Sequence, residues 1–285
     1  MSPQSSSAPA AALLSGEAFP DYAEQLQAFH RAFAAELEAL VAAALPVAAR
    51  RVVDIGCGDG FYVDLLARRM PESGIVVGVD VSPALLSVAQ QSLRGPRCPV
   101  EFVVGDLERL PFAPSEAFDF AWCAQSLYSF PEPEAALRAI ARIVRPRGVV
   151  AVLENDTLHQ LLLPWPGDVE LLLRSAELLE FAAESPRPAK FYVGRRLPSV
   201  LAAAGLQPIE YRTQSIDRIG PPTGALRSLL ASYLDRLRER TSTRLTASQQ
   251  QRVHPFLSPA DERYLLDSPY FTMTWLNVLA WGRRA

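Results

Sequence analysis

The sequence contains few of the residues from which metal centres, disulfide scaffolds and membrane spans are built. It has three cysteines and three histidines among 285 residues. Cys57, Cys98 and Cys123 are far apart and form no CxxC pair, so no zinc-site spacing is present and a reducing compartment is indicated. No apolar run approaches the ~20 residues that span a bilayer. We therefore predict no bound metal, no disulfide framework and no membrane partner.

The overall charge is also small. The formal net charge is −3, with 49% hydrophobic and 21% charged residues, a balance typical of a globular protein with a full core. Nothing in this charge favours a nucleic-acid partner. Residues 1–16 contain no Lys or Arg and so lack the basic start of a secretory signal. We interpret residues 1–20 as a disordered tail and expect a cytoplasmic protein, monomeric or homodimeric.

From residue 50 onward, short β-branched segments alternate with longer segments of helical periodicity. The strands that this pattern predicts cover residues 51–55, 75–80, 100–104, 117–123 and 148–154. The helices predicted between them cover residues 60–70, 83–94 and 133–144. Strands that alternate with helices through short loops are typical of a parallel sheet with helices on both faces. We therefore predict an α/β fold.

The segments on either side of this region are mainly helical. Leu26, Phe29, Phe33 and Leu37 recur at helical spacing and predict a helix over residues 21–45. After residue 156 we predict helices over 157–184, 194–204 and 223–266, and strands over 207–214 and 270–283. The chain is thus interpreted as one domain, residues 21–285, with helical cap insertions at about 157–193 and 216–266.

A glycine turn follows the first predicted strand. Gly56, Gly58 and Gly60 allow a tight turn that exposes backbone to a ligand, and the next helix directs free N–H groups to the same place. Dinucleotide enzymes use GxGxxG, whereas the spacing here is GxGxG and Phe61 takes the next position. Asp54, close to the turn, disfavours a diphosphate and suits a ligand with an ammonium group. A nicotinamide or flavin oxidoreductase is therefore the weaker alternative.

Two more carboxylates follow neighbouring predicted strands. Asp80 ends the second strand, where a carboxylate can accept hydrogen bonds from both hydroxyls of a ribose. Asp106 follows the third strand and could bind an adenine amino group, with the ring between Val81 and Leu107. Asp59 is interpreted more simply, as a solvated charge at a helix start. The pattern as a whole predicts a nucleoside ligand that carries a cationic group.

At this point the chain resembles the class I S-adenosylmethionine (SAM)-dependent methyltransferases. The resemblance is close over about residues 50–154 and rests on motifs in a fixed order: Val53-Asp54-Ile55-Gly56-Cys57-Gly58-Asp59-Gly60, Gly78-Val79-Asp80, Gly105-Asp106-Leu107, Phe118-Asp119-Phe120 and Arg145-Pro146-Arg147-Gly148. It implies a Rossmann-like, mostly parallel seven-stranded sheet with an N-terminal helix and an inserted helical cap. Arg147 departs from the glycine usual at its position.

The resemblance also implies roles for individual residues. Asp54 and the turn Gly56–Gly60, which includes Cys57 and Gly58, would hold the methionine part of SAM. Asp80 would hold the ribose, with Asp106, Leu107 and Val81 at the adenine. Family members often place an aromatic residue of the N-terminal helix over the methionine, which makes Tyr22 a candidate. The residues expected beside the sulfonium, at the end of the fourth strand, are Cys123, Ala124 and Gln125.

The sequence indicates the methyl acceptor less clearly than the cofactor. A sulfonium methyl is already activated, so transfer needs an aligned acceptor, and a general base only if the acceptor carries a proton. His159 is the best candidate base, because it lies five residues past Glu154, near the predicted end of the fifth strand. Tyr128 and Glu154 are the other candidates. A lone histidine is more often a packing or surface residue than a base.

We therefore predict an enzyme that methylates a small organic molecule. O-methylation is the preferred chemistry, with C- or N-methylation as the alternatives. A Lys-poor composition rich in Ala, Leu and Arg suggests a GC-rich bacterium and is consistent with specialised metabolism. A SAM-binding protein with a non-methylating activity, such as cyclisation, fits the same motifs. Arg236, Arg238 and Arg240 are interpreted as a solvated helix face rather than an RNA-binding patch.

Overall fold

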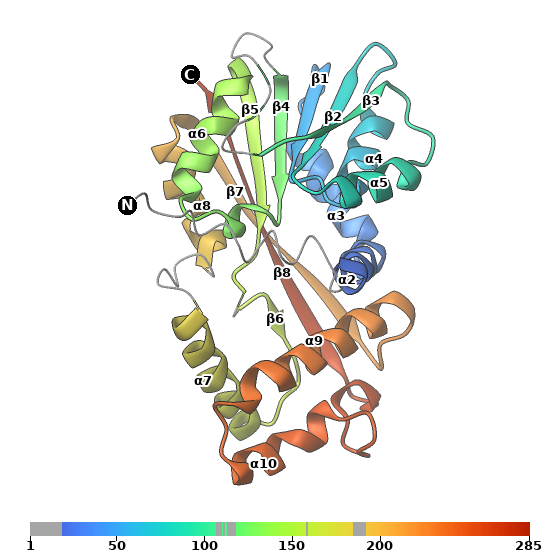
Figure 1. The fold of residues 1–285 in the computed structure, drawn as a ribbon, viewed down its shortest axis with the longest axis vertical. Coiled ribbons are helices and arrows are strands. Elements are labelled where there is room, and N and C mark those ends of the chain that lie inside the picture. Colours follow the sequence, from blue (N-terminus) through green and yellow to red (C-terminus); the bar gives the residue numbers. More distant parts are fainter. Residues whose placement is uncertain (1–18, 107–109, 111, 113–117, 158, 185–191) are drawn as a thin grey trace.

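The structure, a computed structural model, describes residues 19–106, 110, 112, 118–157, 159–184 and 192–285. The predicted tail over residues 1–20 lies almost wholly outside this range. Five parallel strands stand side by side in the order β3-β2-β1-β4-β5 (Figure 1). Their bounds are β1 Arg51–Ile55, β2 Ile75–Asp80, β3 Val100–Val104, β4 Phe118–Ala124 and β5 Val144–Glu154. All five lie within a few residues of the predicted strands.

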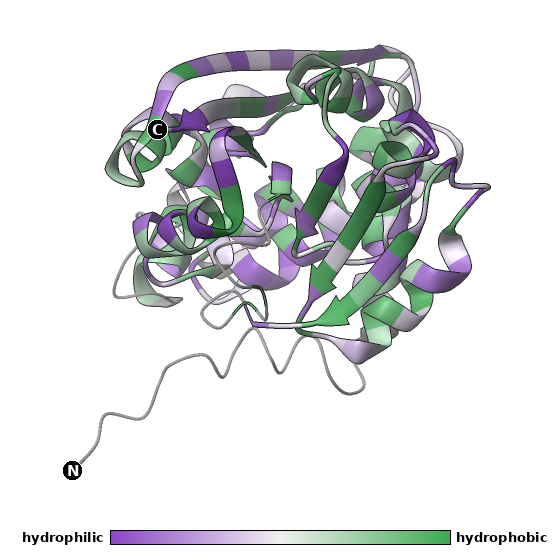
Figure 2. Ribbon diagram, turned by 90° about the horizontal axis from the view of Figure 1, so that it is seen from above, coloured by the Kyte–Doolittle hydropathy of each residue, from purple (hydrophilic) through white to green (hydrophobic). Residues whose placement is uncertain are grey.

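Helices cover both faces of this sheet because alternate residues of each strand point to opposite sides. On β1, Val52 packs in the hydrophobic cluster shared with α3 and α4, and Val53 packs in the cluster shared with α6 and α8. The helices are α3 Ala34–Ala44, α4 Phe61–Arg69, α5 Pro83–Ser92, α6 Pro133–Ile143 and α8 Val193–Ala203. In Figure 2 the central strands are accordingly hydrophobic along most of their length. The predicted Rossmann-like fold is confirmed.

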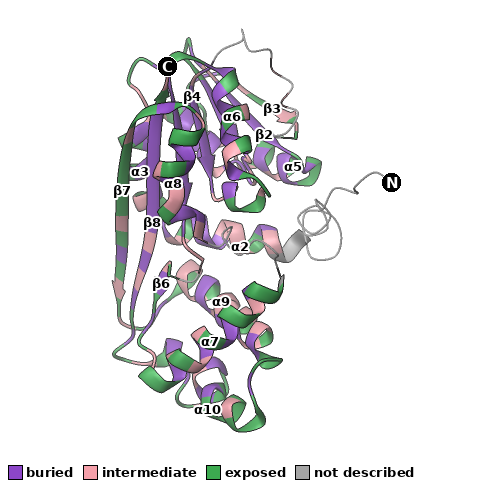
Figure 3. Cartoon of the chain, turned by 90° about the vertical axis from the view of Figure 1, so that its left-hand side faces the viewer, coloured by how far each residue is buried: buried purple, intermediate pink, exposed green. Residues whose placement is uncertain are grey.

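Two long antiparallel strands complete the sheet. β8 (Thr272–Arg284) pairs with β5 through residues 278–283, and β7 (Leu206–Ile219) pairs with β8 along its outer edge. β8 is mostly buried and β7 mostly exposed, as Figure 3 shows. A two-residue strand, β6 (Leu161–Leu162), pairs with β8 beyond the end of β5. The helix predicted to begin at residue 157 is therefore wrong in its first part, because this segment pairs with β8 as an extended strand.

The remaining helices gather beyond the carboxyl ends of the parallel strands. α7 (Gly167–Glu184), α9 (Gly224–Ser242) and α10 (Ala247–Leu257) lie together there, and α2 (Phe19–Ala32) lies between them and the sheet (Figure 1). The single helix predicted over residues 21–45 is two helices, α2 and α3, separated at Phe33. Within the described ranges, no helix is both long and apolar enough to cross a membrane.

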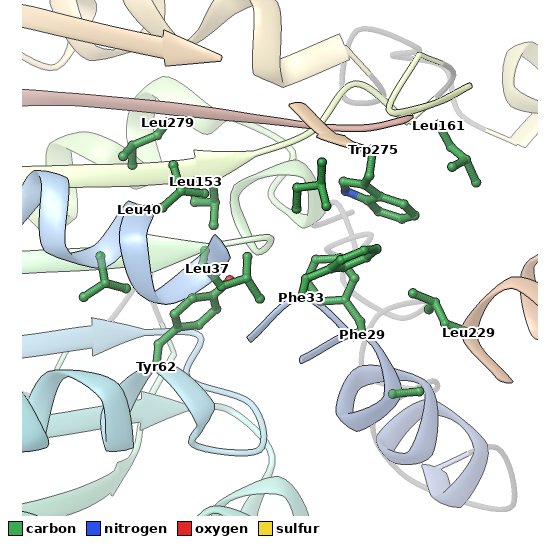
Figure 4. Close-up of a cluster of buried hydrophobic side chains, with 14 of the residues drawn as sticks. Phe29, Phe33, Leu37, Leu40, Tyr62, Leu153, Leu161, Leu229, Trp275 and Leu279 are labelled. Atoms are coloured by element: carbon green, nitrogen blue, oxygen red, sulfur yellow. The ribbon is translucent and has the colours of Figure 1, made fainter. Parts of the chain in front are cut away.

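An apolar cluster joins the sheet to these outer helices. Phe29 of α2, Phe33 and Trp275 of β8 have ring centroids 5.2–5.4 Å apart, and Leu37 lies next to them (Figure 4). Leu229 of α9 belongs to the same cluster, and Phe33 and Leu37 are completely buried. Because aromatic pairs add to the free energy gained by burial, this cluster holds α2 against both halves of the protein.

We expect Phe33→Ala to lower the free energy of unfolding by about 3–5 kcal/mol, because it leaves a cavity between α2 and β8. Urea denaturation followed by circular dichroism measures the change. Ile219→Ala is the control, since Ile219 is 87% exposed at the end of β7 and its truncation should be almost neutral. Equal stability of the two variants would show that the cluster does not join the two halves.

Candidate functional site

The glycine turn at the carboxyl end of β1 can be formed only by glycine. Gly56, Gly58 and Gly60 have φ angles of 71°, 54° and 78°, in the left-handed region. A Cβ on Gly56 would lie 2.4 Å from Oγ of Ser126, and a Cβ on Gly60 would lie 2.8 Å from Cβ of Ala89. The turn is therefore fixed both by its backbone angles and by close packing.

Asp54 lies beneath this turn with a buried carboxyl group. It is 1% exposed, and neither carboxyl oxygen has a hydrogen-bond partner within the described part of the chain. Burial raises the pKa of Asp54 well above its usual value, and the charges of Asp80 and Asp59 raise it further. An unpartnered buried carboxyl is costly, so its presence indicates a ligand that supplies a donor.

Asp80 holds the other side of the turn. Its Oδ2 accepts a hydrogen bond from the backbone N–H of Gly58 at 2.9 Å, and its Oδ1 accepts one from Ser82 at 2.9 Å. Burial raises the pKa of Asp80, while these backbone donors act in the opposite direction. The N–H of Val81 is a third backbone donor, and because a carboxylate has about four acceptor positions, about one remains for a hydroxyl group of a ligand. This residue therefore organises the turn and can still accept a hydrogen bond from a ligand.

The two cysteines of the predicted site have buried side chains. Cys57 is 4% exposed and Cys123 is completely buried among core residues of the sheet. Burial is the main cause of a raised pKa at both thiols, so both stay protonated. Ala124 is buried as well, and Gln125 has a φ of 50° with its N–H bonded to the carbonyl of Leu153 at 2.8 Å. These residues shape the end of β4 mainly through their backbone.

Helix α2 covers the glycine turn. A Cβ on Gly58 would lie 3.1 Å from Cδ2 of Leu26, so this leucine packs directly on the turn. The pKa of Tyr22 is raised, first by burial and then by the negative charges of Asp80 and Asp59. The predicted role of Tyr22 over the methionine part of SAM stays a prediction.

A buried polar contact beneath α2, between His30 and Asp59, was not predicted from the sequence. Asp59, predicted to be solvated, is 5% exposed and lies 3.1 Å from Nδ1 of His30. The imidazole of His30 stacks on Phe61, with centroids 4.2 Å apart and an interplanar angle of 9°. His30 lies on the buried face of the predicted N-terminal helix, and that face is the one signal that could have identified it.

The adenine end of the predicted site is only partly described. Val81 is 49% exposed and Asp106 is also exposed, both next to the carboxyl ends of their strands. Leu107 lies outside the described residues. The roles of these three residues therefore stay predictions.

The structure brings two of the three candidate bases together. Oε1 of Glu154, at the end of β5, accepts hydrogen bonds from the N–H groups of Leu127 at 2.6 Å and Tyr128 at 3.3 Å. Burial raises the pKa of Glu154 to about 8 although these donors lower it. Burial also raises the pKa of Tyr128, and the charges of Tyr22 and Glu154 contribute. Tyr128 and Glu154 are therefore joined at the carboxyl edge of the sheet through the backbone N–H of Tyr128, a residue that is 39% exposed.

His159 lies in a different environment. It is exposed, and its Nδ1 is 3.1 Å from a guanidinium nitrogen of Arg195, which also forms an ion pair with Asp156. Its ring is 6.1 Å from that of Tyr192. These contacts attach His159 to α8 rather than to the glycine turn. No group of three potential metal ligands occurs within the described ranges.

Comparison with known proteins agrees with this geometry. Residues 53–152 match the family described as a methyltransferase domain. The chain is 32% identical to a ubiquinone biosynthesis O-methyltransferase of Alkalilimnicola ehrlichii over 48% of its own length and 60% of the relative's. It is 31% identical to the ubiquinone/menaquinone biosynthesis C-methyltransferase UbiE of Azotobacter vinelandii, over 58% of this chain and 69% of that protein.

Solved structures show the same fold. The YcgJ protein of Bacillus subtilis superposes with a TM-score of 0.51 at 18% identity, covering 87% of this chain and 97% of that one. The protein bound to the Trm112 methyltransferase activator of Haloferax volcanii superposes with a TM-score of 0.55 at 16% identity, covering 94% and 96%. With the sequence relatives, this defines the class: the chain belongs to the class I SAM-dependent methyltransferases.

The raised pKa of Glu154 gives a pH test of the site. The usual pKa of a glutamate side chain is 4.5, and that of folded Glu154 is about 8. Between these two pH values, Glu154 keeps a proton in the folded protein that it has lost in the unfolded chain. The stability of the protein therefore falls as the pH rises through this range. Glu154→Gln removes this titrating group. We therefore expect the free energy of unfolding of the variant, relative to that of wild type, to increase by up to ~1.4 kcal/mol for each unit by which the pH rises in this range.

Urea unfolding at pH 5, 6.5 and 8 without ligand measures this difference. The exposed Glu262 provides the control, since Glu262→Gln should leave the pH dependence of stability unchanged. Parallel stability curves for Glu154→Gln and wild type would contradict a buried, protonated Glu154.

Proposed function

We propose that the protein transfers the methyl group of SAM to a small organic acceptor. The observation that carries this proposal is the buried carboxyl of Asp54, which has no partner within the described residues and lies beneath a glycine turn. Neither a packing role nor a diphosphate ligand accounts for it, whereas the ammonium group of SAM would supply the missing donors.

The residues present fit the rest of the cofactor. Asp80 has about one acceptor position left for a ribose hydroxyl, and exposed Val81 offers an apolar surface for the adenine. Tyr22 and Leu26 on α2 would cover the methionine part. When bound, SAM supplies an activated methyl group, and the protein's own contribution is to align the acceptor and exclude water.

The acceptor that we propose is one whose reacting atom carries a proton. Glu154 lies at the carboxyl edge with a pKa of about 8, a value suited to proton transfer near neutral pH. A base is useful for a hydroxyl group or an acidic carbon. We therefore propose O-methylation first and C-methylation second, in bacterial specialised metabolism. The names of the two relatives include one O- and one C-methyltransferase.

We propose the cellular compartment of the protein from the state of its cysteines. All three are free and buried, which suits a reducing compartment such as the cytoplasm.

We expect Asp80→Ala to weaken SAM binding by about 1–3 kcal/mol, because it removes a charged acceptor of hydrogen bonds. Isothermal titration calorimetry measures the affinity. The matched control is Asp119→Ala, at the opposite edge of the sheet, where Asp119 accepts hydrogen bonds from the N–H groups of Arg50 and Arg51. This control should cost stability and leave SAM affinity unchanged. Unchanged affinity in Asp80→Ala would refute the assignment of the site.

Three substitutions distinguish the candidate bases. Glu154→Gln and Tyr128→Phe should each lower turnover at least tenfold with little change in SAM affinity if these groups handle the acceptor proton. His159→Gln tests the remaining candidate in the same way. Turnover is measured with radiolabelled SAM and a panel of small phenols and hydroxyquinones. A variant with full turnover removes its residue from the mechanism, and label in no product favours a non-methylating activity.

A further inference from the structure

A polar cavity lies among the outer helices, separate from the glycine turn. Its volume is about 100 Å³. It is lined by side chains of the segment after β5 and of helices α7 and α9, namely Thr157, Gln160, Glu177, Tyr233, Arg236, Leu237 and Arg240. Such a volume is smaller than the ~150 Å³ that accommodates a benzene ring, so the cavity suits one functional group of a larger molecule.

The charges around this cavity are unbalanced. Glu177, which is 3% exposed, is held by Arg174 at 3.1 Å and by Arg240 at 3.4 Å. Arg174 also pairs with Glu170 at 3.7 Å and does not line the cavity, whose charged lining side chains are two guanidinium groups, Arg236 and Arg240, and one carboxylate, Glu177. Arg240 also packs on the ring of Phe181, 4.8 Å from its centroid, which fixes its position. The wall of the cavity thus carries an excess of positive charge.

Arg236 has a buried guanidinium nitrogen, Nη1, that makes no hydrogen bond within the described residues. Burial lowers the pKa of Arg236, and the neighbouring charge of Arg240 lowers it further. The solvated face predicted for the three arginines of α9 is therefore wrong for Arg236, whereas the Arg240 side chain is 34% exposed. The prediction holds for Arg238, which is paired at the surface with Asp235 at 2.9 Å.

We propose that this cavity binds a carboxylate group of the methyl acceptor, with Arg236 as its principal partner. A guanidinium group presents two parallel N–H donors that match the two oxygens of a carboxylate. Glu177 on the same wall repels additional negative charge, so a carboxylate with one charge is favoured over a phosphate with two.

The cavity lies near the carboxyl edge of the sheet, where Glu154 ends β5. Thr157 is three residues beyond Glu154, so their Cα atoms are no more than ~11 Å apart. The side-chain amides of Asn155 and Gln160 lie 3.0 Å apart and connect the end of β5 to the cavity wall. A molecule with one aromatic ring and a short acidic arm spans such a distance. The inference deepens the proposed function, on which it rests for the identity of the ligand as the acceptor.

The test uses butyrate and its uncharged isostere butyramide, without SAM, in ligand-observed NMR titrations of the full chain. We expect butyrate to bind at least tenfold more tightly than butyramide and more tightly than inorganic phosphate. Arg236→Gln should weaken butyrate binding at least tenfold, and the matched control Arg238→Gln should leave it unchanged. Equal binding of the two probes, tighter binding of phosphate, or unchanged binding in Arg236→Gln would overturn the proposal.

A second measurement excludes a purely structural role. If Arg236 awaits a ligand, Arg236→Gln keeps or raises the unfolding temperature, because it removes an unpaired buried group. Glu177→Gln should strengthen butyrate binding severalfold, since it removes the competing negative charge. A marked loss of stability in Arg236→Gln, or weaker butyrate binding in Glu177→Gln, would show that Arg236 serves the fold. Because SAM is absent, these results stand apart from those of Asp80→Ala.

Discussion

Strand β8 is the element on which the two halves of the protein depend. Its backbone pairs with β5 and β6 along one edge and with β7 along the other, so almost every peptide group of the strand is used. Residues 278–283 complete the catalytic sheet, while Trp275 reaches the aromatic cluster beyond it. A single continuous strand therefore fixes the outer helices relative to the parallel strands without a separate linker.

The candidate site combines two kinds of buried acid. Asp54 and Glu154 both have raised pKa values because burial disfavours their charged forms. Glu154 has backbone N–H donors, whereas Asp54 has no partner within the described ranges. Asp119, at the other end of the sheet, shows the contrast: backbone and Arg145 hydrogen bonds lower its pKa and outweigh its burial. Carboxyl groups of one sheet thus include buried acids with raised pKa values at one edge and a strand-positioning acid with a lowered pKa at the other.

Much of the sheet could be predicted from the sequence, for local reasons, whereas the ligand contacts of the cofactor-site residues stay predictions. The first five strands are short, β-branched and bounded by turns, so their limits follow from the pattern. Distant partners could not be predicted. Leu161 pairs with Trp275 across more than a hundred residues, and Asp59 is buried only because α2 brings His30 to it. The inward direction of Arg236 likewise depends on how α9 packs against α7, which periodicity alone does not determine.

Helix α2 touches both halves of the molecule. Leu26 packs on the glycine turn at Gly58, and the same helix packs against α9 (Figure 3). Arg236 of α9 lines the polar cavity. Displacing α2 from one half therefore also breaks its contacts with the other. A substitution in α2 that disturbs its packing on the glycine turn therefore also disturbs its packing on α9.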